Sequence, residues 1–172
     1  MILGFDTYYF DNKAKTVCIC FKDWKDSEPC EIFTEIIDEV SDYESGAFYK
    51  LELPCILNLL QKVKVEGINY IIVDGFVVLD DYGKLGLGGY LYKALNEKIS
   101  VIGIAKTGFF NNKKNVRELF RGKSKKPLYI SAIGLELDKA YELIKTMHGN
   151  NRIPTLFQIL DTKTKEGVKN YE

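Results

Sequence analysis

The sequence predicts an α/β protein with a mixed sheet, in which three antiparallel strands are followed by parallel strands and helices flank the sheet. Two observations predict this class. The N-terminal part contains three β-rich segments separated by turn-like residues, which is typical of an antiparallel meander. The remainder alternates segments of helical periodicity with short, continuous apolar runs, and such runs indicate strands that are buried on both faces.

The first elements are predicted from β-forming residues and turns. Residues 2–10 and 16–21 are apolar and aromatic and flank a turn-like Asp-Asn-Lys, which predicts a hairpin. A third strand is expected near residues 31–36. Residues 51–63 carry apolar side chains at helical spacing, and Pro54 falls in the first turn of that helix, where a missing N–H is tolerated.

The later elements alternate between strands and helices. Buried strands are predicted at residues 70–73, which form a continuous apolar run, and at residues 100–105 and 128–133. Helices are predicted at three periodic segments, at residues 85–95, 137–147 and 155–164. Ligands of open α/β sheets gather at the carboxyl ends of the parallel strands. Asp74 and Lys106 directly follow two predicted strands, so both are candidates for a functional site.

The composition is that of a soluble globular protein. The chain has 172 residues, of which 46% are apolar and 28% are charged, and this length is enough for a core of its own. No internal repeat or linker is visible, so residues 1–172 are predicted to form one domain. Lys plus Arg and Asp plus Glu both number 24. An anionic partner must therefore be bound by a local basic patch rather than by the net charge.

The cysteines and the N-terminus indicate the compartment. There are four cysteines, no Cys-x-x-Cys pair and one histidine, so a zinc site is not expected and buried free thiols in a reducing compartment are the better interpretation. The N-terminus lacks a basic segment followed by an apolar one. No apolar run approaches the roughly 18 residues of a membrane span. We therefore expect a cytoplasmic protein without membrane contact, and no obligate protein partner is evident.

Four acidic residues are candidate ligands of a hard cation. Each has an ordinary alternative: solvent exposure on an edge strand for Asp6, a turn for Asp74, compensation of a helix dipole for Glu52 and exposure on a late helix for Asp161. Magnesium prefers oxygen ligands, and a pair of ions roughly 3.5–4 Å apart activates water and stabilises the leaving oxygen of a phosphodiester. The predicted strands allow Asp6 and Asp74 to converge at one end of the sheet.

A basic segment at residues 113–126 follows the predicted strand at residues 100–105. It has one acid, Glu118, among its basic residues, which are Lys113, Lys114, Arg117, Arg121, Lys123, Lys125 and Lys126. Phosphate contacts supply most non-specific nucleic-acid affinity, and the nearby Phe109, Phe110 and Phe120 are able to stack on bases. A solvated basic loop is the alternative. The position just after Lys106 favours binding, with Lys113, Lys114 and Arg117 as the predicted contacts.

Six short motifs occur in order along the chain. They are Gly4-Phe5-Asp6, YESGAFYKLELP at residues 43–54, Val73-Asp74-Gly75, Leu85-Gly86-Leu87-Gly88, Gly103-Ile104-Ala105-Lys106, and Arg152-Ile153-Pro154 followed by Asp161. Together they resemble the endonuclease V family over nearly the whole chain. The resemblance implies a ribonuclease H-like fold, cleavage of DNA or RNA on the 3′ side of inosine or deoxyinosine, and magnesium or manganese as the cofactor.

The resemblance also implies roles for single residues. Asp6 and Asp74 match the two metal-binding aspartates of the family, and Glu52 matches a catalytic glutamate. Lys106 matches an active-site lysine, and Asp161 matches the fourth catalytic acid.

Substrate recognition is where the chain departs from the family pattern. Tyr43 and Gly46 match the Tyr-x-x-Gly of a wedge loop, which implies contact with nucleic acid. The prolines that flank the wedge tyrosine are replaced here by Asp42 and Ser45. The family's Asp-Gly-His-Gly and His-Pro-Arg motifs are replaced by Asp-Gly-Phe-Val at residues 74–77 and Asp-Asp-Tyr-Gly at residues 80–83. Both histidines and the arginine are therefore absent.

Three interpretations of function follow from the sequence. The first is a metal-dependent endonuclease acting on inosine-containing or structurally disturbed nucleic acid. The second is a nucleic-acid-binding protein on the same fold without turnover. The third is a phosphodiesterase acting on another lesion or structure. The retained acids favour the two enzymes over the binding protein, and the altered wedge favours the third over a strict inosine enzyme.

Overall fold

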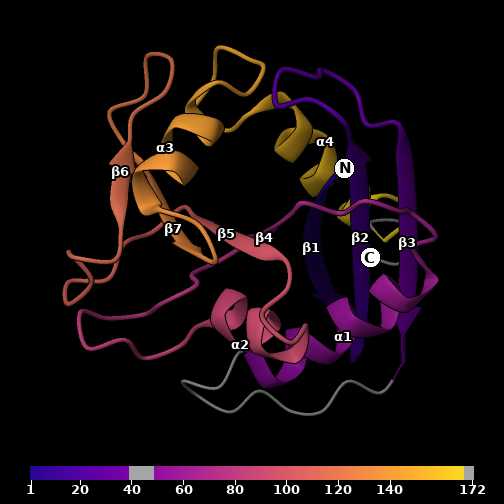
Figure 1. The fold of residues 1–172 in the computed structure, drawn as a ribbon. Helices are drawn as coiled ribbons and strands as arrows, with labels where there is room; N and C mark the ends of the chain where they lie inside the picture. Colours follow the sequence, from indigo (N-terminus) through magenta and orange to yellow (C-terminus); the bar gives the residue numbers. More distant parts are fainter. Residues whose placement is uncertain (39–48, 169–172) are drawn as a thin grey trace.

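The computed structural model of the chain describes residues 1–38 and 49–168. Seven strands in these ranges form one mixed sheet with the order β3-β2-β1-β4-β5-β7-β6 (Figure 1). The elements are β1 (Ile2–Phe10), β2 (Lys13–Phe21), β3 (Glu31–Ile37), α1 (Tyr49–Lys62), β4 (Tyr70–Asp74), α2 (Leu87–Ala94), β5 (Ser100–Ala105), β6 (Arg117–Leu119), β7 (Leu128–Ile133), α3 (Leu137–Lys145) and α4 (Thr155–Lys165). The predicted mixed sheet with flanking helices is confirmed.

The antiparallel meander formed by β1, β2 and β3 is also confirmed. Its first hairpin turns at Asp11 and Asn12, whose φ angles are 46° and 58°. Asp and Asn tolerate this left-handed conformation, which a two-residue type I′ turn requires at both central positions. β1 then pairs in parallel with β4, and β4 in parallel with β5. The carboxyl ends of these three strands therefore lie at one edge of the sheet.

The direction of β7 differs from the prediction. β7 pairs with β5 in antiparallel fashion, and β6 pairs antiparallel with β7. The expectation of a parallel strand over residues 128–133 is therefore wrong in direction, although the strand itself is confirmed. A parallel connection needs a crossover, usually through a helix. The chain between β5 and β7, which the structure describes in full, contains only the short strand β6.

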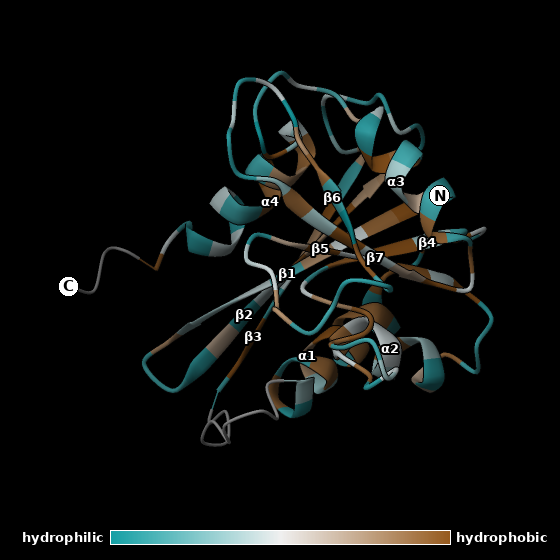
Figure 2. Ribbon diagram, turned by 90° about the vertical axis from the view of Figure 1, so that its left-hand side faces the viewer, coloured by the Kyte–Doolittle hydropathy of each residue, from teal (hydrophilic) through white to brown (hydrophobic). Residues whose placement is uncertain are grey.

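Helices cover both faces of the sheet. α1 and α2 pack on one face, and α3 and α4 pack on the other (Figures 1 and 2). Side chains of a strand alternate between its faces. In β1, Leu3 and Phe5 belong to the core under α1 and α2. The side-chain position of Gly4 points the other way, toward Ile19 of β2 and Leu160 of α4. This alternation directs Asp6 toward the side of α4.

Two smaller expectations have different outcomes. Cys18, Cys20 and Cys55 are buried free thiols, as predicted, whereas Cys30 is a free thiol that is exposed. The expectation of burial is wrong for Cys30 because it directly precedes the edge strand β3. Among residues 1–38 and 49–168, no helix has the length and apolarity needed to cross a membrane. The cytoplasmic location stays a prediction.

Candidate active site

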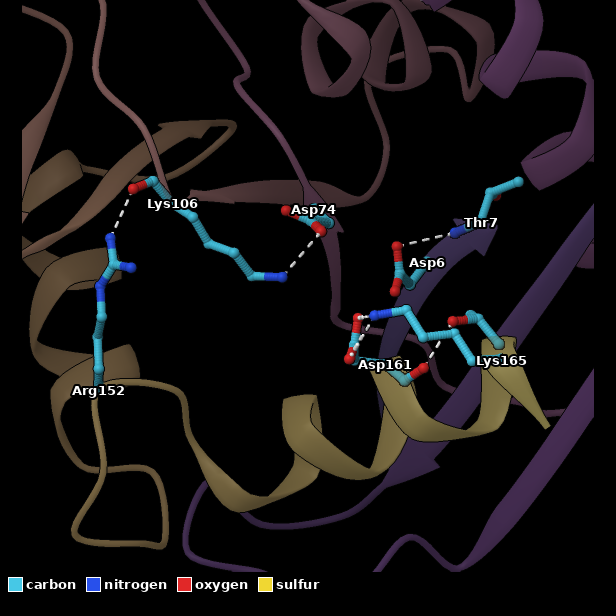
Figure 3. Close-up of polar contacts among 8 residues, drawn as sticks. Asp6, Thr7, Asp74, Lys106, Arg152, Asp161 and Lys165 are labelled. Carbon is cyan, nitrogen blue, oxygen red and sulfur yellow. Dashed lines mark hydrogen bonds and ion pairs between the residues drawn. The ribbon is translucent and has the colours of Figure 1, made fainter. Parts of the chain in front are cut away.

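The pairing of the central strands brings Asp6, Asp74 and Lys106 to one edge of the sheet. Phe5 of β1 pairs with Val73 of β4, so Asp6 and Asp74 are the next residues on neighbouring parallel strands. Asp74 in turn pairs with Ile104 of β5, and Lys106 directly follows that strand. Figure 3 shows these three side chains turned toward a common space.

Helix α4 completes this space from one face of the sheet. Asp6, Asp74, Lys106 and Asp161 line a hollow of about 20 Å³, together with the apolar residues Ile104, Ile153, Pro154, Phe157 and Leu160. A hollow of this size holds roughly one water-sized species. Leu160 is buried in the core beneath α4, and this packing presents the next residue, Asp161, to the hollow.

Two lysines form ion pairs with Asp74 and Asp161, two of the acids that line the hollow. The Nζ atom of Lys106 lies 3.7 Å from Oδ2 of Asp74. The Nζ atom of Lys165 donates to both carboxylate oxygens of Asp161, at 2.9 Å each (Figure 3). Asp6 accepts a hydrogen bond from the backbone N–H of Thr7 at 2.9 Å. Lys165 was not predicted from the sequence, although its spacing of four residues from Asp161 on a predicted helix is a recognisable signal.

Arg152 is a second residue that the sequence did not single out as functional. Its Nη2 atom donates to the carbonyl oxygens of Lys106 and Pro127 (Figure 3 shows the first of these). These bonds tie the segment before α4 to the end of β5 and to the residue before β7. Arg152 therefore positions the backbone of Lys106 rather than facing the hollow itself.

The protein environment disfavours negative charge on these acids. Burial, reinforced by the charge of Asp74, raises the pKa of Asp6 to about 7, against smaller opposing effects of the Thr7 N–H and Lys106. Burial also raises the pKa of Asp74, and Lys106 partly offsets this effect. Acids that resist ionisation in this way, within a hollow, are typical of sites that hold a cation or move a proton.

Glu52 approaches the same acids from the opposite layer. It lies in the first turn of α1 and is only 3% exposed. Burial and the charges of Asp6 and Asp74 raise its pKa well above the usual range. The residues that line the hollow do not include Glu52. Asp6, Asp74 and Asp161 therefore line one hollow, and Glu52 lies outside it, on α1.

The donor set fits a small divalent cation. Carboxylate oxygens are the ligands that magnesium and manganese prefer. The carboxylates of Asp6, Asp74 and Asp161 line a hollow with room for one water-sized occupant. Within the described residues, no three Asp, Glu, His or Cys side chains are already arranged as a metal site. Lys165 holds Asp161 in an ion pair, so full coordination requires these side chains to rearrange.

The predicted nucleic-acid contacts are only partly visible. Tyr43 and Gly46 lie outside the residues that the structure describes. Lys113 and Lys114 are exposed in the loop after β5. The guanidinium of Arg117 stacks on the ring of Tyr141 at 3.8 Å and pairs with Asp138 of α3 at 2.8 Å. Its role in phosphate binding stays a prediction.

Arg121 does not belong to the basic surface that the sequence indicated. It is only 7% exposed. Its guanidinium donates to the carbonyl oxygens of Met147 at 2.7 Å, Asn151 at 2.8 Å and Gly149 at 3.1 Å. Its donors satisfy carbonyl oxygens between α3 and α4, so Arg121 is not available to a phosphate.

The sheet order, the two helical layers and the acids at the ends of β1 and β4 define a ribonuclease H-like protein. The sequence model of the endonuclease V family matches residues 1–161, and the chain belongs to this family. The predicted family is therefore confirmed. A search of curated protein sequences finds no match.

Solved structures of the same family share this fold. Human endonuclease V is similar with a TM-score of 0.76 at 21% identity, covering 98% of this chain and 84% of the human one. Endonuclease V of Ciona intestinalis, in complex with a DNA 24-mer that contains an inosine followed by a ribo-adenosine, has a TM-score of 0.80 at 17% identity, covering 99% and 87% of the two chains. The Bacillus subtilis protein has a TM-score of 0.76 at 21% identity, covering 99% and 80%.

Proposed function

We propose that this chain is a divalent-metal-dependent endonuclease that cleaves a phosphodiester bond on the 3′ side of inosine, deoxyinosine or a related lesion in DNA or RNA. The observation that carries this proposal is the hollow at the carboxyl ends of β1 and β4, lined by Asp6, Asp74, Lys106 and Asp161. Membership of a nuclease family supports phosphodiester hydrolysis. The inosine-containing DNA bound to the Ciona relative supports the substrate.

The charged residues in and around the hollow have separate roles in this reaction. Asp6 and Asp74 hold the magnesium or manganese ion, with Asp161 and Glu52 completing the acidic surroundings. When bound, such an ion lowers the pKa of an attacking water and takes up charge at the leaving oxygen. Lys106 lies close enough to Asp74 to donate a hydrogen bond to a phosphate oxygen beside it and to stabilise developing negative charge. Arg152 keeps the backbone of Lys106 in place.

The central test is cleavage of labelled oligonucleotides with and without one inosine, as DNA and as RNA, in magnesium, manganese or chelator. Asp74→Asn keeps the shape of the side chain and removes one unit of ligand charge, so we expect cleavage to be lost while folding and nucleic-acid binding persist. Asp38→Asn, at an exposed aspartate paired with Lys13, is the matched control. Wild-type cleavage in chelator, or equal cleavage by Asp74→Asn, rules out the metal mechanism.

A nucleic-acid-binding protein without turnover is the second candidate. One observation favours it: Phe76, which replaces a family histidine, is buried and packs on Phe109 with ring centroids 5.0 Å apart. No titratable side chain is therefore available at this position. Binding without cleavage in either metal would support this candidate. Cleavage of other damaged or branched substrates, but not of inosine-containing ones, would support the third interpretation.

A further inference from the structure

Two loops beside the hollow are joined into a single surface. Residues 79–84 follow β4, residues 109–116 follow β5, and together we call them the two-loop platform. The Oδ1 atom of Asp81 accepts the backbone N–H groups of Lys113 at 2.7 Å and Lys114 at 2.6 Å. The backbone N–H of Asp81 donates to the carbonyl oxygen of Asn111 at 2.9 Å. Asp81, which belongs to the altered motif at residues 80–83, therefore fixes the position of the loop at residues 109–116.

Further bonds make each loop of the platform well defined. The Oδ1 atom of Asp80 accepts the backbone N–H groups of Tyr82 at 2.9 Å and Lys84 at 3.0 Å. The carbonyl oxygen of Asp80 accepts a bond from the side chain of Asn115 at 3.0 Å. The side chain of Asn112 donates to the carbonyl oxygen of Val78 at 2.7 Å. The residues that replace the family motif thus form a connected scaffold between the loops.

This scaffold exposes two aromatic rings to solvent. Tyr82 is 96% exposed and Phe110 is 87% exposed. Phe110 lies between two hollows, one of about 500 Å³ that also contacts Tyr129 and one of about 310 Å³ that also contacts Tyr82. The Phe110 side chain is therefore accessible from both hollows. A large exposed aromatic pair on well-bonded loops indicates a binding surface rather than a part of the core.

Lysines lie beside these rings, although Asp81 and Glu118 also line the two hollows. Lys113 lines both hollows, and its Nζ atom lies 5.2 Å from the centroid of Phe110. Lys114 lines the smaller hollow beside Tyr82. Aromatic rings interleaved with lysines suit a single strand, because bases stack on the rings while the ammonium groups meet the phosphates. In a duplex the bases are stacked on one another and their faces are not available to Phe110 or Tyr82.

The platform is attached at the edge of the sheet that carries the acids. Phe76 and Phe109, one from each connection, pack on each other at 5.0 Å. Phe76 is two residues from Asp74, and Phe109 is three residues from Lys106. The platform therefore begins within a few residues of Asp74 and Lys106, two side chains of the proposed catalytic hollow.

We propose that the two-loop platform binds unpaired nucleotides by stacking bases on Phe110 and Tyr82 and by pairing phosphates with Lys113 and Lys114. Single-stranded nucleic acid is then the preferred form of the substrate. The nucleic-acid class rests on the proposed function, whereas the preference for unpaired bases rests on the platform alone.

Fluorescence anisotropy in chelator tests this proposal without cleavage. The probes are a labelled single-stranded 15-mer and the same sequence as a duplex. Because stacking contributes about 1–3 kcal/mol per base, we expect Phe110→Ala to weaken single-strand binding roughly 5- to 150-fold and to leave duplex binding nearly unchanged. Tyr82→Ala should act in the same direction, and Tyr82→Phe should retain most of the affinity.

Two comparisons separate stacking from other effects. Ile36→Ala removes an apolar side chain that is 52% exposed on the edge strand β3 and should leave single-strand affinity unchanged. Lys113→Ala should reduce the salt dependence of binding by about one counterion, whereas Phe110→Ala should not change it. Circular dichroism and thermal melts establish that each variant is folded.

The outcomes distinguish this inference from the proposed function. Wild type that binds single strands through Phe110 but cuts no substrate overturns the nuclease proposal and supports the platform. Unchanged single-strand affinity in Phe110→Ala and Tyr82→Ala overturns the platform, whatever the cleavage assays give. An equal loss of affinity for duplex and single strand overturns it as well, because stacking on unpaired bases cannot produce that pattern.

Discussion

At the scale of single residues, Asp6 lies in a strand interior where its carboxylate is desolvated and close to that of Asp74. This environment raises its pKa from 3.8 to about 7. Below the unfolded pKa, the carboxyl group is protonated in both states and its titration contributes nothing to stability. As pH rises from about 4 to about 7, the unfolded chain ionises and the folded site resists ionisation. The metal-free protein therefore loses stability across this window, and the loss persists above it.

The variant Asp6→Asn tests this consequence. We expect it to raise the melting temperature of the metal-free protein at pH 7.5, with a gain that disappears toward pH 4. One pKa unit corresponds to about 1.36 kcal/mol, so the upper limit is about 4 kcal/mol. Thermal melts in chelator between pH 4 and pH 8 measure the effect, with Asp38→Asn as a control that should show no such trend. A variant less stable than wild type at pH 7.5 would contradict the prediction.

At the scale of elements, most strands and helices could be predicted because their apolar periodicity is continuous. The run at residues 70–73 and the meander before it correspond to β4 and to β1–β3. The direction of β7 was missed, although the absence of a predicted helix between residues 105 and 128 already disfavoured a parallel connection. β6 was missed because a three-residue strand within a basic segment has no periodicity to detect.

The candidate site was predicted to a similar extent. The predicted strand ends and the ordered motifs indicated four site residues, Asp6, Asp74, Lys106 and Asp161. All four line one hollow in the structure. The spacing of Lys165 from Asp161 is a signal that sequence reasoning missed, whereas the contribution of Arg152 depends on how the loop before α4 docks, which no local pattern of the sequence encodes. The burial of Arg121 is another such case: the residues around it are polar and basic, and only the turns between α3 and α4 explain its position.

Helix α4 carries both an acid of the hollow and its competing cation. Because Lys165 binds both oxygens of Asp161, a metal ion in the hollow has to compete with an ammonium group. We expect Lys165→Met to tighten manganese binding by roughly five-fold, since a partly exposed ion pair is worth about 1 kcal/mol or less. Isothermal titration calorimetry measures this affinity directly.

The control for this prediction lies on the same helix. Lys163 pairs with Glu166 at 3.1 Å and not with an acid of the hollow, so Lys163→Met should leave manganese affinity unchanged. If Lys165→Met binds manganese as weakly as wild type or more weakly, Lys165 supports the site and does not compete with the metal.

At the scale of the whole molecule, opposite charges are separated although the net charge is zero. Three carboxylates line the hollow, whereas the two-loop platform presents Lys113 and Lys114 at its surface. A nucleic acid that approaches the platform therefore meets attraction from Lys113 and Lys114 and repulsion from the acids of the hollow, whose charge Lys106 and Lys165 only partly offset. Local charge, rather than the overall field of the protein, controls affinity in such a case.

A divalent cation should change this balance. Calcium is also a hard cation that prefers oxygen ligands, so at constant ionic strength we expect it to raise wild-type affinity for a single-stranded 15-mer several-fold by neutralising the hollow. Asp74→Asn should start from an affinity equal to or above that of wild type, and its response to calcium should be smaller because one ligand is lost. Anisotropy titrations with calcium replaced by an equivalent ionic strength of potassium isolate the effect. Equal weakening by both salts would mean that calcium only screens the platform, and that the acids of the hollow do not act on the bound strand.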